Sequence, residues 1–538
     1  MGTTACSGHD LDPGRAAVAP RSGDLGGATP DDGLVTQWRE DHHGPDAGTQ
    51  GDAQGDAAPS PTCVPEAGVD EPDPDFVDSN CDGIDGDASA AVFVAPSGSD
   101  AAVGSMAEPV RTIARAISLA AAAGKSVYAC NGVYDENVHL DGAAVSLHGG
   151  YDCARGWRRV RDRAIVKPSS GVPLAITAVA RPVIVDRFAF RAPDATAPSD
   201  SSIAASVAGS TVHFVRVELA AGNGAPGSPG AAVSSTWPNV KTARDGESAI
   251  IGPNDTCYEW DHPQNPICST IARGGASLPT RCATGGFVVG GAGGDGGNVF
   301  RESPAGPGMP GTPASPSASK SAGPGGNGAP GEPGTAFGSI REGRYWTTNS
   351  GKNGRAGAPG FGGRGGNGGP SYADHSSPVA SFAPGGGGGQ GGFPGCGGEG
   401  GNAGTPGGAS IALVVSDGTV DLAWSVLISS RGGDGGGGSD GKPGQKGGPG
   451  GAGGKGSCMT CDGRPGGAGG DGGSGGPGGP GGGGPSLGVA SVRSSITTSN
   501  VDFQIGRPGM GGASSAGSGA DGAAGEVFSA DVPGDAGK

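Results

Sequence analysis

The chain has few aromatic residues, no long apolar stretch and little histidine. Phe, Trp and Tyr make up 5% of its 538 residues, and His occurs eight times. So few aromatic side chains disfavour a large conventional core, and a core would have to come from aliphatic residues stacked in strands. No apolar run is long enough to cross a bilayer as a helix. The histidines fall mostly in linkers and turns, which leaves a nucleophilic triad unsupported.

Glycine and proline are abundant instead, at 118 and 45 residues. Four stretches, 351–369, 386–407, 432–456 and 463–484, carry glycine at every third position. Three residues per turn is the period of an extended left-handed helix, so the fixed glycines should line one ridge where backbones approach closely. Proline is too sparse for collagen, and glycine often fills a second position of the triplet. We expect polyglycine-II-like insertions or, as the alternative, disordered ones.

One segment is written three times, at residues 202–222, 410–430 and 486–506, and the copies align without a gap at offsets of 208 and 284. Each copy reads as two short β-type runs rich in Val, Ile, Leu and Thr around a small-residue turn. Further apolar anchors recur every 19 or 20 residues at Val145, Ile165, Ile184 and Ile203. Strands that recur without intervening helices predict a stack of β-coils, with the glycine-rich segments inserted between coils.

The start of the stack has its own signals. Ala91 to Ala95 reads as a strand, and a helix that opens at Glu108-Pro109 and stops at Gly124 could cover the open end of the stack. These features divide the chain into a flexible acidic tether (1–72), an Asp-rich motif (73–90), a β-helix core (91–222), a Cys-containing and glycine-rich insertion (223–408), a second coil repeat (409–430), a glycine-triplet insertion (431–485), a third coil repeat (486–506) and a loose Gly/Ala/Ser-rich tail (507–538).

Acidic residues concentrate near the N-terminus, where residues 1–90 hold 19 Asp or Glu against three Arg. Such a tract argues against nucleic acid as a partner and favours divalent cations or solubilisation. Asp78-x-Asn80-x-Asp82-Gly83 matches the opening of a calcium-binding loop, but the twelfth position is Ser89 instead of Glu. We expect a weak, structural Ca²⁺ site completed by Asp85 or Asp87. The alternative is a solvated acidic linker stapled by Cys63 and Cys81.

Eleven cysteines without metal-binding pairs of pairs favour an oxidising compartment. Cys6 lies in Thr4-Ala5-Cys6-Ser7, which resembles the cleavage site of a bacterial lipoprotein. We expect a start codon upstream and a lipid on Cys6 that anchors the protein to the outer membrane; an ordinary surface cysteine is the alternative.

The remaining ten cysteines are enough for five disulfides. Cys130 and Cys153 lie about one coil apart and are candidates for a bridge between neighbouring turns. Cys458 and Cys461 read as a local staple at the tip of a glycine hairpin. A small disulfide-stapled knot is expected around Cys257, Cys268 and Cys282, with its connectivity open.

The sequences VFVAPSGSD, PVRTIARAISLA and VYACNGVYDENVHLDGAAVSLHGGYD resemble the opening of right-handed parallel β-helix proteins of the pectin-lyase-like superfamily. The block DSNCDGIDGD is similar to the Asp-rich repeats of thrombospondin type 3 and to a metal-binding motif of bacterial surface proteins. The glycine runs resemble those of PE-PGRS surface proteins. The resemblance implies an all-β, right-handed parallel β-helix (solenoid) outside the cytoplasm, and for this subfamily it implies no proven activity.

Enzymes of that superfamily cluster carboxylates on facing coils, and the repeats show no such cluster. The polar residues of the first repeat change in the other two: His213, Arg216 and Glu218 become Asp421, Trp424 and Val426, then Thr497, Asn500 and Asp502. Asp186, Arg187 and Glu218 are the best remaining candidates, and each is more typical of a solvated rim. The basic cluster Arg158, Arg159, Arg161 and Arg163 beside Trp157 is likewise expected to be a solvated face.

We therefore predict no catalytic residue. The sequence favours a cell-surface structural or adhesive protein that contacts polysaccharide or matrix. The alternatives are a carbohydrate-active enzyme of pectate-lyase type and a polyglycine-II module that interacts with ice or matrix.

Overall fold

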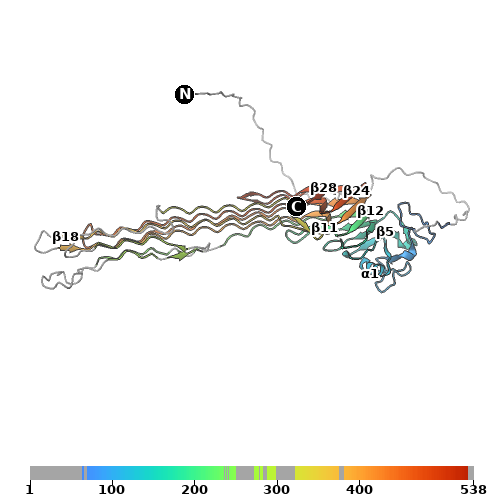
Figure 1. The fold of residues 1–538 in the computed structure, drawn as a ribbon, viewed down its shortest axis with the longest axis horizontal. Coiled ribbons are helices and arrows are strands. Elements are labelled where there is room, and N and C mark those ends of the chain that lie inside the picture. The colour runs from blue at the N-terminus through green and yellow to red at the C-terminus, as the bar shows by residue number, and fades with distance from the viewer. Residues whose placement is uncertain are drawn as a thin grey trace, which may run out of the picture. The chain divides into compact units, whose positions relative to one another are not determined.

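The computed structural model describes residues 63–65, 70–234, 237, 239, 241–249, 272–277, 279–282, 287–297, 322–374 and 381–530. Cys6, Cys257 and Cys268 lie outside these residues. Three parallel sheets, here A, B and C, dominate the described part of the chain (Figure 1). The chain visits them in rotation, one strand each, so that every cycle forms one coil of a β-solenoid.

Sheet A stacks β1 (Ala91–Val94), β2 (Ser126–Cys130), β5 (Leu147–Asp152), β9 (Val183–Asp186), β12 (Thr211–Val215), β21 (Thr419–Ala423) and β24 (Ser495–Ser499), with β6 (Arg158–Arg159) antiparallel to β5. Sheet B stacks β3 (Gly132–Tyr134), β7 (Ala164–Val166), β10 (Phe188–Arg191), β13 (Glu218–Ala220), β22 (Val426–Ser429) and β25 (Asp502–Ile505). Sheet C stacks β4 (Val138–Asp141), β8 (Leu174–Thr177), β11 (Ser202–Ala208), β20 (Ser410–Ser416), β23 (Ser486–Val492) and β28 (Ala524–Ser529).

Side chains that point inwards form ladders through the coils. One ladder in sheet A joins Val127, Leu147, Val185, Phe214 and Leu422, each of them at most 1% exposed. Alternation along the strands produces this arrangement: in β4, Val138 and Leu140 are buried while His139 and Asp141 are exposed. Full burial of each such aliphatic or aromatic side chain contributes about 1.5–3 kcal/mol, so the core is a column of small increments.

The three sequence repeats lie directly on one another. Ser202 pairs with Ser410 and Ser410 with Ser486, which reproduces the ungapped alignment as strand register. Each repeat supplies three strands, one to each sheet, although the sequence indicated only two β-type runs. The third strand was missed because it is short: β13 has three residues and follows β12 after a two-residue corner.

The series of apolar anchors was interpreted wrongly. Ile165 lies in β7 of sheet B, Ile184 in β9 of sheet A and Ile203 in β11 of sheet C, so the anchors are not equivalent positions of successive coils. Ile184 is even 36% exposed. The true spacing between coils varies with the length of the corners: Val127 pairs with Leu147, but Leu147 pairs with Val185.

The glycine-rich segments all leave and rejoin the solenoid at one corner, between a strand of sheet B and the next strand of sheet C. They separate β13 from β20, β22 from β23, and β25 from β28. Outside the solenoid they run side by side (Figure 1) and are joined by backbone hydrogen bonds at three-residue intervals. Gly398 and Gly401, for example, donate to the carbonyls of Gly473 and Gly476 at 2.8 Å.

Steric contact explains why glycine recurs in these segments. In the triplet Gly472-Gly473-Ser474, a Cβ atom on Gly472 would meet the carbonyl of Cys396, and one on Gly473 would meet that of Gly326, both closer than 3.0 Å. Ser474 is exposed. The second glycine of the triplet, which argued against collagen, therefore faces a second neighbouring segment.

Four antiparallel pairs lie outside the main sheets: β14 (Thr280–Arg281) with β15 (Phe287–Val288), β16 (Ser339–Arg341) with β17 (Arg344–Trp346), β18 (Tyr372–Asp374) with β19 (Ser381–Ala383), and β26 (Ala513–Ser514) with β27 (Gly517–Ser518). Residues 507–530 differ from the loose tail expected after Gly506, because β28 pairs with β23 and extends sheet C. Strand β28 is therefore the sixth strand of sheet C, although this part of the chain is rich in Gly and Ala.

Helix α1 (Ile113–Ala123) buries Ile113, Ala116, Ile117 and Ala120 in the same core as the first strands. It begins later than Pro109 because Val110 still bridges to Val94 and Thr112 caps the helix. Gly124 ends the helix in the left-handed conformation. No helix in the described ranges is long and apolar enough to cross a membrane.

Disulfides join Cys63 with Cys81, Cys130 with Cys153, Cys282 with Cys396, and Cys458 with Cys461. Cys282 thus pairs outside the compact knot that the sequence suggested. Its partner Cys396 lies in a glycine-triplet segment, at a position of the triplet that is buried beside Val288. Several disulfides indicate an oxidising, extracytoplasmic compartment.

Candidate functional site

The outer face of sheet C is only partly covered. The β16–β17 hairpin, which belongs to a glycine-rich insertion, packs Ile340 and Tyr345 against Ile411, Val414 and other side chains of the later coils. The outer face of the earlier strands β4 and β8 is left beside the hairpin as an open groove of about 730 Å³. Solenoid and insertion therefore build this groove together.

Outward-facing side chains of sheet C form the floor of the groove, and those of Ala175 and Ser206 are small. His139, Ala175 and Ser206 occupy one outward ladder on β4, β8 and β11. One wall includes Asn137, whose side-chain amide donates to the carbonyls of Ser170 and Val172 at 3.0 Å and so fixes that loop. Residues 344–347, which include strand β17 of the hairpin, also line the groove, and Trp346 among them is 51% exposed.

The lining combines a larger apolar surface with hydroxyl groups, and it is balanced in charge. Exposed Arg344 and Asp200 both line the groove, and neither forms an ion pair with another residue that the structure describes. Hydroxyl groups come from Ser170, Ser199, Ser201, Ser206 and Thr347. A floor of small side chains, an exposed indole ring and both donors and acceptors suit a flat, hydroxyl-rich ligand.

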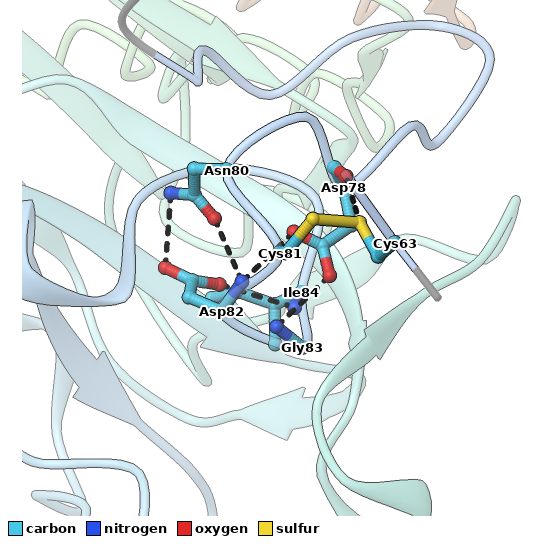
Figure 2. Close-up of a disulfide and its surroundings, with 7 residues drawn as sticks. All are labelled: Cys63, Asp78, Asn80, Cys81, Asp82, Gly83 and Ile84. Atoms are coloured by element: carbon cyan, nitrogen blue, oxygen red, sulfur yellow. Dashed lines mark hydrogen bonds between the residues drawn. A yellow bond between two sulfur atoms is a disulfide. The ribbon is translucent and has the colours of Figure 1, made fainter. Parts of the chain in front are cut away.

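The acidic loop forms a tight turn beside the Cys63–Cys81 disulfide (Figure 2). The carboxylate of Asp78 accepts from the backbone N–H groups of Asp82 and Gly83 at 3.1 and 2.9 Å. The side chain of Asn80 accepts from Asp82 N–H at 2.9 Å and donates to the Asp82 carboxylate at 3.1 Å. In the described part of the chain, no three His, Cys, Asp or Glu side chains form a group that could hold a metal ion.

The other two predicted ligands are engaged elsewhere. Asp85 is 3% exposed, and its carboxylate accepts from Arg159 Nη1 at 3.0 Å and from Asp73 N–H at 2.9 Å. Burial nevertheless raises the pKa of Asp85. Asp87 caps the short turn Ala88–Ala90 by accepting from Ser89 N–H at 2.7 Å. Hydrogen bonding to the Ser89 side chain, and to a lesser extent to its N–H, lowers the pKa of Asp87.

The candidate catalytic residues lie in an arginine network. Arg159, whose side chain is fully buried, joins Asp85 to Asp186, and Asp186 also contacts Arg216 at 3.5 Å. Asp186 is 3% exposed, so a substrate cannot reach its carboxylate. Glu218 binds Arg191 at 2.7 Å and Arg163 at 3.7 Å. Each carboxylate therefore has structural partners.

The only residues of the three-repeat comparison that meet as a polar ladder are His213, Asp421 and Thr497. His213 Nδ1 lies 2.9 Å from the carboxylate of Asp421, to which the hydroxyl of Thr497 also donates. Sequence reasoning missed Arg159 as the anchor of Asp85 because the two are 74 residues apart. It also missed the groove, because nothing in the sequence places residues 339–346 over sheet C.

No protein-family model, curated protein or solved structure matches this chain. The β-solenoid architecture accordingly rests on the sheet topology and register alone.

Proposed function

We propose that this protein is an extracytoplasmic, cell-surface structural or adhesive protein that holds polysaccharide in the groove over sheet C. The observation that carries the proposal is the exposed indole of Trp346, held over a floor of small and hydroxyl-bearing side chains. The C–H faces of a pyranose ring pack well on an aromatic ring, whose face is electron-rich. Disulfides support a location outside the cytoplasm.

The remaining architecture fits a surface stalk. We infer a right-handed β-helix of the pectin-lyase-like type, with α1 as the cap of its first coil and the glycine-rich segments as polyglycine-II-like projections. Hydrogen bonds at three-residue intervals and close approaches at glycine support the last point. A lipid on Cys6 would tie the acidic tether to the outer membrane.

The test is retention of oxidised, full-length protein on a panel of neutral and acidic polysaccharides. Trp346→Ala should weaken retention on the bound polymer about two- to tenfold, because one stacked aromatic ring contributes about 0.5–1.5 kcal/mol. Tyr372→Ala is the control, since Tyr372 is 53% exposed but does not line the groove. Equal retention of both variants would place the ligand elsewhere, and release of soluble products would favour an enzyme.

We also propose a weak, structural Ca²⁺ site at Asp78, Asn80 and Asp82. The side chains already point into one turn, which a hard cation would stiffen through carboxylate and amide oxygens (Figure 2). Ca²⁺ should slow proteolysis of residues 73–87, and chelation should restore it. Asp78→Asn should abolish this protection, whereas Asp75→Asn, outside the turn, should not. Protection that is indifferent to Ca²⁺ and to Asp78→Asn would contradict this site.

A further inference from the structure

The basic cluster around Trp157 meets more arginines where sheet A turns into sheet B. Arg163 Nε donates to the carbonyl of Arg216 at 2.8 Å. Arg187 Nη1 lies 3.5 Å from the carbonyl of Arg161. The cluster, which the sequence suggested would be one solvated face, is therefore part of a larger group on neighbouring coils.

Positive charge exceeds negative charge in this group. Its arginines are Arg159, Arg163, Arg187, Arg191 and Arg216, and the carboxylates paired with them are Asp85, Asp186 and Glu218. An excess of half-buried cations is unusual in a chain whose net charge is −17. Uncompensated charge away from water is costly, so such a group favours binding of an anion.

Arg187 is the residue without a carboxylate partner. It is 6% exposed, its Nε is buried without a hydrogen-bond partner, and its guanidinium lies 4.6 Å from the ring centre of Phe76. Asp186, its neighbour in sequence, is engaged with Arg159 and Arg216. Burial lowers the pKa of Arg187 to about 10; the charge of Asp186 opposes this shift, and the charges of Arg159, Arg216 and Arg163 add to it. The positive charge of Arg187 is therefore not neutralised by an ion pair with a described carboxylate.

The exposed ring of Trp424 lies at the same corner between sheets A and B, on a later coil than Arg216. Arg187, Arg216, Trp424 and Asn500 each take the left-handed backbone conformation there, at φ of 56°, 52°, 53° and 53°. Arg216 N–H donates to the carbonyl of Ala423, the residue before Trp424, so the two side chains leave adjacent coils, about 4.8 Å apart. Trp424 is 60% exposed.

We propose that this arginine corner, defined as Arg163, Arg187, Arg216 and Trp424, is a second, non-catalytic binding site that takes an acidic sugar. The anionic group, carboxylate or sulfate, pairs with the partly exposed guanidinium groups of Arg163 and Arg216, the buried charge of Arg187 adds to the positive potential behind them, and the sugar ring stacks on Trp424. The corner differs from the groove over sheet C in both residues and charge. The inference rests on the proposed function only in taking a carbohydrate as the class of ligand.

Calorimetric titration of the full-length, oxidised protein tests the site with oligogalacturonate, a sulfated oligosaccharide and inorganic sulfate. Arg216→Asn keeps the backbone conformation, which Asn500 adopts in a later coil, and should weaken oligosaccharide binding at least about tenfold. Arg181→Asn removes the same charge from an exposed residue at the other end of β9 and should change affinity less than about twofold. Arg163→Gln provides a second variant should Arg216→Asn fail to fold.

The remaining arms separate the parts of the proposal. Trp424→Asn should weaken binding of the acidic oligosaccharides and leave binding of inorganic sulfate unchanged. Equal loss in Arg216→Asn and Arg181→Asn, or no binding of any probe, would overturn the site. Loss of the acidic oligosaccharides in Trp346→Ala instead would place them in the groove, which would refute the arginine corner and leave the proposed function standing.

Discussion

Gly475 offers the sharpest test of how the glycine-rich segments pack. A Cβ atom at this position would lie closer than 3.0 Å to the carbonyl oxygen of Glu399 on the neighbouring segment. That carbonyl accepts from Lys442 N–H at 2.8 Å, and Gly475 N–H donates to the carbonyl of Lys442 at 2.8 Å. Alanine at position 475 therefore pushes apart three segments at once.

The cost of Gly475→Ala follows from these contacts. Two backbone hydrogen bonds weaken, at about 0.5–1.5 kcal/mol each, and overpacking adds about 1–3 kcal/mol. The lower chain entropy of unfolded alanine returns about 0.4–1 kcal/mol. Together these contributions span about 1–5.6 kcal/mol, and we expect a local destabilisation near the middle of that range, about 2–4 kcal/mol. Ser474→Ala is the matched control, because Ser474 is exposed and should change stability by less than about 0.5 kcal/mol.

Amide hydrogen exchange measures this effect where it occurs. Exchange at Lys442 and Gly475, whose N–H groups are both bonded between segments, should accelerate about 30- to 700-fold in Gly475→Ala. Ser474→Ala should leave it unchanged. Similar exchange in the two variants, or fast exchange at these amides in the unaltered protein, would show that the segments do not pack as described.

Three further predictions concern the solenoid, its pH dependence and the cross-link. Leu422→Ala empties an inward position that is 1% exposed and should lower the free energy of unfolding by about 2–5 kcal/mol in urea titrations. Burial, with Arg159 nearby, lowers the pKa of His148 from 6.5 to about 3, so between these values the unfolded chain binds a proton that the folded chain does not. Stability should therefore fall as pH decreases through this window, by at most about 1.4 kcal/mol per pH unit, and His148→Phe should flatten that slope. Replacing Cys282 and Cys396 by serine opens a closure of 114 residues and should cost up to about 5 kcal/mol, measured as a lower unfolding midpoint.

The repeats predicted the register of the coils because a parallel stack forces equivalent residues onto one ladder. A shift by one residue would turn Val420 and Leu422, both buried, out of the core, so the ungapped alignment had one consistent solution. The short strands of sheet B could not be predicted in this way. A three-residue strand such as β13 shows no periodicity, and corner lengths that vary from coil to coil conceal the repeat in residues 126–220.

Contacts between distant segments account for the other misses. The acidic motif was interpreted as a calcium-binding loop or, alternatively, a solvated linker, and neither interpretation included contacts with the solenoid. The carbonyls of Asp73 and Asp85 nevertheless accept from Arg159 and Tyr151 of the solenoid. The groove depends on the β16–β17 hairpin, residues 339–346, which belongs to an inserted segment and packs on sheet C. Pairings of this kind are set by where the inserted segments return, which local patterns do not encode.

Glycine placement in the segment 432–456 shows that neighbours, more than backbone flexibility, select this residue. Every third residue from Gly432 to Gly453 faces the segment 463–484, and all of these are glycine. The adjacent row is glycine at 433 and 436, which face Ala225 and Ser228, and again at 451 and 454, which face Arg244 and Glu247.

Between these two contacts the same row carries Ser439, Lys442 and Gln445 before glycine returns at Gly448. The ammonium of Lys442 there lies 5.7 Å from the ring centre of Trp237, in space that a closely packed backbone would otherwise fill. A row of glycine thus marks a packed neighbour, and its interruption marks room for side chains. By the same logic, a Gly436→Ala substitution should disturb the bundle, whereas Lys442→Ala, which inserts no atom between the segments, should leave the backbone packing intact.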